Sequence, residues 1–493
     1  MVFNSYTFVA FIIIMLALHN LPFSWKTKKI NLLIASYIFY AAWNPVFILL
    51  LWLSTVVDFF VGRALYTQPN IHKRRLLLVI SLIGNLGMLC FFKYGGFLLE
   101  NFTAVCNLIG FNFHPAKPSI ILPAGISFYT FTTLCYTIDM YKKESKPVKS
   151  LLDFSLFVTF FPHLVAGPIV RPPQLVPQFE TPRKATGQQF INGLALLTLG
   201  LFMKVVCADT LLAGTADSVF GTDGNLGSLD AWTGVLAFSG QIFFDFAGYS
   251  TSAIGVALCL GFILPQNFSY PYAAIGFSDF WKRWHITLST WLRDYLYIPL
   301  GGNRAGKFRT YINIMITMLI GGLWHGANWT FVAWGGLHGI YLWIEKAIRD
   351  SKNKVRPLVA NNENMIIAQA SLAPNLDGNP ASGFIKALLT FLLICITWVF
   401  FRANTFILSW RMLQSMFGLS KPSGPPLLNT IDIIKVGIVI LLMLIFHWVM
   451  RNTNVLKAVE KLPWWMVSIT WAILLILIII SQGSSKSFIY FQF

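Results

Sequence analysis

Apolar runs close to 20 residues long recur along the whole chain, and short polar or basic loops separate them. A run of this length is enough for a helix to cross a bilayer. The pattern predicts an all-α polytopic membrane protein with about 11–13 transmembrane helices. The clearest predicted spans cover residues 5–22, 189–210, 230–262, 311–325, 329–347, 385–401, 434–450 and 464–481.

Composition and charge agree with a membrane protein. The chain is 56% hydrophobic and 11% charged, whereas soluble proteins carry about 25% charged residues. The net charge of +18 comes from cations in short loops such as 26–29, 72–75 and 142–149, so the positive-inside rule explains it better than a nucleic-acid partner. This rule predicts cytoplasmic loops at these positions and an external N-terminus. Residues 5–22 are interpreted as the first membrane helix and not as a cleaved signal peptide.

Two segments depart from the regular pattern. Residues 151–170 carry cations at both ends and contain Pro162, Gly167 and Pro168, which predicts a re-entrant segment covered by protein. Residues 351–383 are polar and predict the longest loop. The sequence leaves open whether 230–262 forms one span or two. No internal repeat is evident, which weakens a transporter built from inverted repeats. Residues 1–493 are predicted to form a single integral-membrane domain.

The stretch FWKRWHITLSTWLRDYL, residues 280–296, gathers three tryptophans, three cations and a histidine. Residues 279–298 predict one interfacial helix with an aromatic side and a basic side. Anchoring at lipid headgroups would explain the tryptophans and the cations, but not a histidine on the apolar side. That side would carry Trp281, His285, Leu288, Ser289 and Leu292.

Several ionisable residues fall within apolar runs, where charges are costly and often line cavities. A structural pair is the simpler interpretation of any single one, and Lys204 and Asp209 are expected to pair or to extend toward the interface. The set is Asp58, Lys93, Asp139, His163, Lys204, Asp209, Asp245, His325, His338, Arg402 and His447.

His325 has the most suggestive surroundings, in the sequence GGLWHGANW. Neighbouring glycines permit close approach of backbone or ligand, and Trp324 and Trp329 could wall a pocket. A buried histidine there suits proton transfer, although a hydrogen-bonded core histidine is the alternative. The spacing does not decide whether His285, His325 and His338 converge, and no H-E-x-x-H motif supports zinc. The sequence has neither a G-x-S-x-G elbow nor a P-loop.

Seven segments taken together, in this order, resemble the membrane-bound O-acyltransferase (MBOAT) family, and most closely its bacterial alginate O-acetyltransferase branch. The resemblance covers nearly the full length. The segments are LPAGISFYTFTTLCYTIDMYKK (122–143), FFPHLVAGPIVRPPQLVPQF (160–179), QIFFDFAGYSTSAIG (241–255), NFSYPYAAIGFSDFWKRWHITLSTWLRDYLYIPLGGNR (267–304), GGLWHGANWTFVAWGGLHG (321–339), WVFFRA (398–403) and FIYFQF (488–493).

The resemblance implies helices around a central tunnel and names the site residues. His325 matches the histidine of the family's W-H-G motif, the expected catalytic residue, and His285 matches the second signature position in F-W-x-x-W-H. Asp245 is kept, whereas Thr251 stands where branch members often carry Asp. His325 would act as a base or form an acyl-imidazole, while His285 or Asn328 could donate to the oxyanion. Asp245, Trp324 and Asn328 are further candidate tunnel groups.

The resemblance also implies the substrates and partners. The donor would be acetyl-CoA or another acyl thioester from the cytoplasm, with no permanently bound cofactor and no metal. Its phosphates could be attracted by Lys282, Arg283 and Arg304. The acetyl group would cross the bacterial inner membrane to an extracytoplasmic acetyltransferase partner that modifies an exopolysaccharide such as alginate. Two alternatives stay open: acetyl or D-alanyl transfer to peptidoglycan or teichoic acid, and a secondary transporter.

Overall fold

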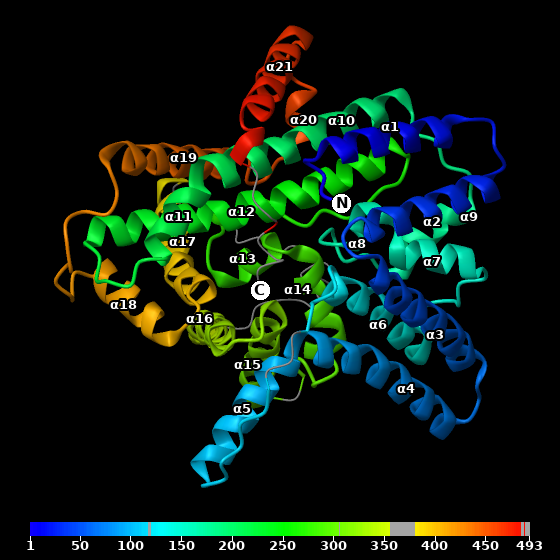
Figure 1. Cartoon of the computed structure of the whole chain (residues 1–493), viewed down its shortest axis with the longest axis horizontal. Coiled ribbons are helices and arrows are strands. Elements are labelled where there is room, and N and C mark those ends of the chain that lie inside the picture. The colour runs from blue at the N-terminus through cyan, green and yellow to red at the C-terminus, as the bar shows by residue number, and fades with distance from the viewer. Residues whose placement is uncertain (117–119, 305, 355–379, 485–487, 489–493) are drawn as a thin grey trace. The chain divides into compact units, whose positions relative to one another are not determined.

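The computed structural model describes residues 1–116, 120–304, 306–354, 380–484 and 488, and all regular structure in these ranges is helical (Figure 1). The chain divides into two compact units. The first unit comprises Met1–Val206, Phe244–Gln266 and Trp465–Phe493, and the second comprises Cys207–Phe243 and Asn267–Trp464. Helix α12 contributes residues to both.

The first unit is built mainly from helices of the N-terminal half. Polar side chains begin many of them, as where Ser5 accepts from the Phe8 N–H and Asn70 accepts from the His72 N–H. The helices are α1 (Tyr6–Asn20), α2 (Trp25–Ala41), α3 (Ile48–Thr67), α4 (Ile71–Leu89), α5 (Gly95–Leu108), α6 (Ile126–Lys142), α7 (Leu151–Thr159), α8 (Phe161–Leu164), α9 (Pro172–Glu180), α10 (Gly187–Leu201), the second half of α12 (Ser228–Cys259) and nearly all of α21 (Trp464–Ile480).

The second unit holds the motif-bearing helices. Short 3-10 or π-helical turns occur in both units, at Pro45–Phe47, Cys90–Tyr94, Phe202–Ala213, Pro271–Ala273, Arg293–Tyr297 and Gln482–Ser484. The α-helices of the second unit are α11 (Gly214–Phe220), the first half of α12, α13 (Phe277–Arg283), α14 (Ile286–Leu292), α15 (Lys307–His325), α16 (Trp329–Lys354), α17 (Pro380–Arg402), α18 (Phe406–Met416), α19 (Thr430–Val449) and α20 (Val455–Val459).

Six helical segments of the described chain are long and apolar enough to cross a membrane. Together with the wholly helical structure, they confirm an all-α, multi-pass membrane protein. Residues 228–259 form one helix, which answers the question left open for 230–262. The total of 11–13 crossings stays a prediction. The six segments are Pro45–Thr67, Ile71–Leu108, Gly187–Phe220, Ser228–Cys259, Ala381–Arg402 and Thr430–Val449, and Tyr6–Asn20 and Trp464–Ile480 are shorter apolar helices.

Two predicted irregular segments have different outcomes. Residues 151–170 are broken as expected, because α7 ends at Thr159 and the four-residue α8 follows. Neither piece is long enough to cross a bilayer, and the side chains of residues 153–170 are buried. At the two ends of the predicted loop 351–383, residues 351–354 belong to α16 and residues 380–383 belong to α17. Residues 355–379 of this loop lie outside the described residues.

A cluster of polar side chains, here called the Asp58 cluster, joins α3, α4 and α6 inside the first unit. Ser81 Oγ donates to Asp58 Oδ1 at 2.6 Å, and Asn85 Nδ2 donates to Asp58 Oδ2 at 2.7 Å. Ser54 and Thr133 donate to the Asn85 Oδ1, each at 3.0 Å. Buried polar groups are tolerated when they are hydrogen-bonded in this way. Asp58 therefore has a structural role.

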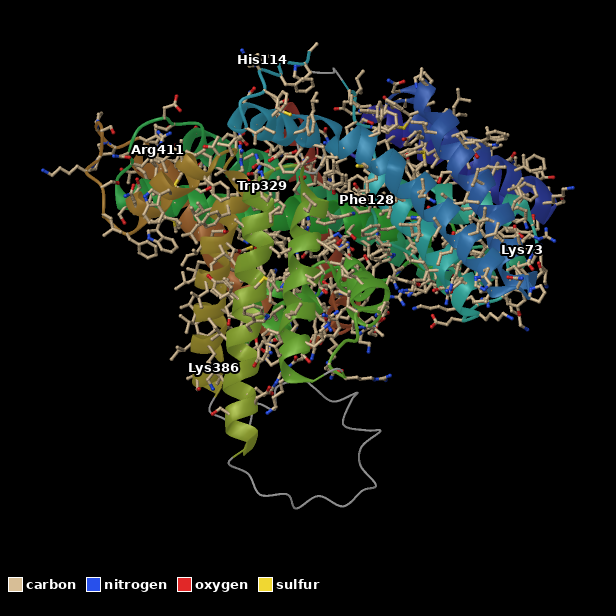
Figure 2. All side chains as sticks on the ribbon, turned by 90° about the horizontal axis from the view of Figure 1, so that it is seen from below. Lys73, His114, Phe128, Trp329, Lys386 and Arg411 are labelled. Atoms are coloured by element: carbon tan, nitrogen blue, oxygen red, sulfur yellow. The ribbon has the colours of Figure 1, made fainter. Side chains whose placement is uncertain are left out.

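Helices α15 and α16 form a close hairpin in the second unit because glycines face the partner backbone. A Cβ atom on Gly322 would lie 2.2 Å from the Phe331 carbonyl oxygen, and one on Gly335 would lie 2.2 Å from the Met318 carbonyl oxygen. No side chain fits at such distances. Helix α17 packs along the other side of α16, and Figure 2 shows Trp329 and Lys386 near opposite ends of this pair. Gly322, one of the glycines predicted to allow close approach, thus serves helix packing.

The continuous interfacial helix predicted for 279–298 is wrong, because the chain breaks at His285. Helix α13 ends at Arg283, α14 begins at Ile286, and a π-helical turn follows at Arg293–Tyr297. His285 has φ 42° and ψ 54°, a left-handed conformation that L-residues seldom adopt. The break removes the predicted shared side of Trp281 and His285.

Candidate active site

His325 is the last residue of α15, and aromatic rings enclose it. Its side chain is 2% exposed. The ring centroids of Trp324 and Trp334 each lie 5.0 Å from that of His325, and Phe401 of α17 lies 5.2 Å away, all three edge-on. The helix end therefore presents the imidazole inside an aromatic wall. Trp324 was expected there, whereas Trp329 is 53% exposed and does not line the wall.

Three histidines and two tryptophans alternate in a row of packed rings, here called the ring chain. Trp324 contacts both His285 and His325, with centroid distances of 5.9 and 5.0 Å. Trp334 contacts both His325 and His338, at 5.0 and 4.7 Å. A tryptophan thus intervenes between successive imidazoles. Within the described ranges, no group of three or more His, Cys, Asp or Glu side chains is placed to hold a metal ion.

His338 connects the ring chain to α17. Its Nε2 lies 3.1 Å from the Thr397 hydroxyl, which itself donates to the Ile394 carbonyl at 2.7 Å. Because that hydroxyl proton is used, Thr397 accepts and His338 donates through Nε2–H. Phe280 stacks on the His338 ring at 5.8 Å. These contacts give His338 a role in holding α13, α16 and α17 together.

His285 lies at the break between α13 and α14 and is fully buried. Its Nδ1 lies 3.2 Å from the Asn267 Oδ1, which also accepts from the Thr287 N–H at 3.3 Å and the Thr287 hydroxyl at 2.9 Å. Burial lowers the pKa of His285 to about 3. The ring is therefore neutral at physiological pH.

Ion pairs and backbone contacts fix α13 beside this break. Asp279 accepts from the Ile275 N–H at 2.9 Å, Arg283 Nε at 2.9 Å and Arg451 at 2.7 Å. Burial acts to raise the pKa of Asp279, but these donors together hold it below its ordinary value. At the other end, Glu345 accepts from the N–H groups of Phe277 and Ser278 at 2.6 and 2.9 Å. Helix α13 is thus anchored at both ends.

The remaining candidates have varied surroundings. Asn328 begins α16 by accepting from the Thr330 N–H at 3.0 Å, and its amide donates to the Asn404 carbonyl at 2.9 Å. Arg283 is committed to Asp279 and to backbone carbonyls, whereas Lys282 and Arg304 are exposed. The oxyanion role of Asn328 and the donor-binding role of the three cations stay predictions.

Asp245 belongs to the first unit, on the second half of α12. Its Oδ1 lies 2.5 Å from the Lys204 Nζ, and both side chains are largely buried. The ion pair of Lys204 with Asp245 joins α12 to the helical segment Gly187–Phe220. The expected pair of Lys204 with Asp209 stays a prediction. Any part of Asp245 in catalysis stays a prediction.

Sequence reasoning missed two residues that contribute to this site. Trp334 contacts both His325 and His338, and its position four residues before His338 on one helix was an available signal. Asn267 holds His285 from 18 residues away. No local pattern could have revealed that contact, because it depends on how the chain folds back along the break.

The chain matches the model of the MBOAT, membrane-bound O-acyltransferase family over residues 137–362. A probable alginate O-acetylase of Pseudomonas aeruginosa is 41% identical over 420 residues, which cover 85% of this chain and 75% of the relative. A peptidoglycan O-acetyltransferase of Helicobacter pylori is 36% identical over 516 aligned positions, which cover 94% of this chain and 91% of the relative.

A more distant relative extends the range of acyl groups. A teichoic acid D-alanyltransferase of Streptococcus thermophilus is 29% identical over 289 residues, covering 54% of this chain and 69% of the relative. The matched family region contains His285, His325 and the helices that carry them. The long alignments at 36–41% identity confirm the resemblance drawn from the motifs. This chain therefore belongs to the membrane-bound O-acyltransferase family and is an O-acyltransferase.

Proposed function

We propose that the chain transfers an acetyl group from a cytoplasmic thioester, acetyl-CoA, across the bacterial inner membrane for O-acetylation of an exopolysaccharide such as alginate. The observation that carries this proposal is His325 at the end of α15, enclosed by Trp324, Trp334 and Phe401. The relatives named as alginate O-acetylases support acetyl as the group and alginate as the polymer class. Exposed Lys282 and Arg304 would attract the phosphates of the donor.

In this mechanism His325 acts as a general base toward an acceptor hydroxyl. The hydroxyl oxygen bonds to the thioester carbon while its proton passes to the imidazole. The C–S bond then breaks, and the thiolate leaves and takes the proton back from His325. The surrounding rings exclude water, which favours transfer over hydrolysis. No charge remains on the histidine at the end of the cycle.

An extracytoplasmic partner completes the proposed pathway. All compact structure in the described ranges belongs to the two helical units. A long polysaccharide needs an extended groove outside the membrane, so a separate acetyltransferase would accept the acetyl group and modify the polymer. This arrangement lets the acetyl group cross the bilayer without its carrier.

A second acceptor, peptidoglycan, is favoured by one observation. The alignment with the Helicobacter pylori peptidoglycan O-acetyltransferase covers 91% of that protein, compared with 75% of the Pseudomonas aeruginosa alginate O-acetylase. The two acceptors are both polysaccharides with free hydroxyl groups, and the same transfer chemistry applies to each.

Purified protein in liposomes with acetyl-labelled acetyl-CoA tests the reaction. We expect release of free thiol with transfer or hydrolysis of the label, and a loss of at least about a hundredfold in His325→Ala. His114→Ala is the matched control, because His114 lies on an exposed loop (Figure 2). A transporter would neither transfer nor hydrolyse the label, and activity retained in His325→Ala would remove His325 from the mechanism. Mass spectrometry of esters on exopolysaccharide and peptidoglycan from cells with and without the chain identifies the acceptor.

A further inference from the structure

The break between α13 and α14 is held by a neighbouring stretch of chain, residues 267–269. The Ser269 N–H donates to the Arg283 carbonyl, and the Ile286 N–H donates to the Asn267 carbonyl, both at 2.9 Å. These two bonds span the left-handed residue, His285. A non-glycine residue keeps such a conformation only when its surroundings enforce it. The backbone at His285 is thus fixed on both sides.

The side chain of Asn267 determines which nitrogen of His285 carries the proton. Asn267 is 1% exposed, and one end of its amide faces Thr287 and His285 together. The backbone N–H of Thr287 can only donate, so the amide oxygen must occupy that end. An amide oxygen can only accept. The His285 Nδ1, 3.2 Å from this oxygen, therefore carries the hydrogen.

This tautomer decides what the other nitrogen of His285 can do. A neutral imidazole has one N–H, so its Nε2 carries a lone pair and accepts hydrogen bonds. The Trp324 side chain lies between the His285 and His325 rings, with ring-centroid distances of 5.9 Å to His285 and 5.0 Å to His325. An oxyanion needs a donor, and this ring has already committed its one N–H to Asn267. His285 is therefore suited to a substrate hydroxyl and not to the oxyanion.

We propose that Asn267 is the positioning residue of His285, holding the ring as its Nδ1–H tautomer so that Nε2 accepts a hydrogen bond from a second O–H or N–H group of the acceptor, next to the hydroxyl that reacts. The proposal rests on the acyl transfer proposed above. The reacting hydroxyl keeps its own proton for His325, and the hydrogen bond from the neighbouring group to His285 Nε2 orients the acceptor molecule before transfer. Asn267 itself would not touch the substrate.

Three variants separate positioning from folding. Asn267→Leu keeps the size but removes the acceptor, and we expect transfer to fall about 10- to 100-fold, as for other residues that orient site groups. Asn267→Asp keeps an oxygen toward His285 and should restore transfer to within about threefold of wild type. Thr287→Val removes only a hydroxyl that shares the Asn267 Oδ1, and it should transfer normally. Rates are compared per folded molecule, with the amount of folded protein measured separately.

Nitrogen-15 NMR of histidine-labelled protein reads the tautomer directly, with His285→Asn used to assign the signal. We expect protonated Nδ1 in wild type and Asn267→Asp, and a mixture of tautomers in Asn267→Leu. A protonated Nε2 in wild type would overturn the proposal, as would equal transfer by Asn267→Leu and wild type. If the wild type itself transfers no acetyl group, the proposed function fails, and so does the proposed hydrogen bond from His285 to the acceptor. The NMR result still tests the tautomer of His285.

Discussion

The Asp58 cluster and the ring chain both bury polar side chains, but different kinds of neighbours surround those side chains. Around Asp58, oxygen and nitrogen atoms from three helices exchange hydrogen bonds of 2.6–3.0 Å. Around His325, three aromatic rings lie edge-on with their centroids 5.0–5.2 Å away. The first arrangement uses its polar atoms to hold helices together. The second places aromatic rings around an imidazole, which limits the access of water to it.

The difference separates stability from function in this molecule. Loss of a hydrogen-bonded partner leaves other buried groups unsatisfied and destabilises the fold. Loss of an imidazole packed among rings removes a proton acceptor and costs mainly packing. An ionisable residue in an apolar run is thus structural or functional according to what surrounds it, and sequence alone does not report the surroundings.

The largest expected effects come from one substitution in each region, His325→Gln and Asp58→Ala. His325→Gln should lower acyl transfer by at least about a hundredfold and leave the unfolding temperature nearly unchanged. Asp58→Ala should lower the free energy of unfolding by about 1–3 kcal/mol, because Ser81 and Asn85 each lose their shortest hydrogen bond. The rate of acyl transfer per folded molecule of Asp58→Ala should stay within about twofold of the wild-type rate. Transfer assays and thermal unfolding in detergent measure both; a rate loss in Asp58→Ala as large as that in His325→Gln would contradict the distinction.

Adjacent glycines in α16 provide the next test. Gly335→Ala places a Cβ atom 2.2 Å from the Met318 carbonyl oxygen, so α15 and α16 must separate, which should cost about 1–3 kcal/mol and displace His325. We expect roughly tenfold slower transfer. Gly336→Ala is the matched control, since its nearest neighbour would be 3.5 Å away at Leu319. Equal behaviour of the two variants would show that close approach of the helices is not what positions His325.

The sequence predicted the helical membrane class, because hydrophobic run length is a local signal. The roles of His285 and His325 came from the family motifs and stay predictions. The sequence did not predict the break at His285. That break depends on residues 267–269 packing against the segment, which is a tertiary contact that overrides the helical pattern. The same reason explains why Asn267 was missed and why the pairing of Lys204 with Asp245, 41 positions along the chain, was not predicted. Contacts between distant segments decided each of these.

A smaller effect concerns acid sensitivity in the ring chain. The folded pKa of His285 is about 3, below its ordinary 6.5, so the unfolded chain binds one more proton between these values. The folded state therefore loses stability as pH falls below 6.5, by about 1.4 kcal/mol per pH unit from this group. His285→Asn should make the fall of unfolding temperature between pH 7 and pH 5 shallower. His114→Asn, in an exposed loop, should not; identical slopes in wild type and His285→Asn would refute a buried neutral ring.

The smallest expected effect lies at the surface, where the two units again differ. If Lys282 and Arg304 attract the donor phosphates, Lys282→Ala with Arg304→Ala should raise the KM for acetyl-CoA about two- to fivefold at low salt and leave kcat unchanged, since exposed charges act at long range. The difference should shrink in 0.5 M salt, because screening shortens that range to a few ångströms. Lys73→Ala removes an equally exposed cation of the first unit (Figure 2) and should leave KM unchanged. Equal changes in KM for all these variants would mean that the cations act only through overall charge, and that no donor site lies near Lys282.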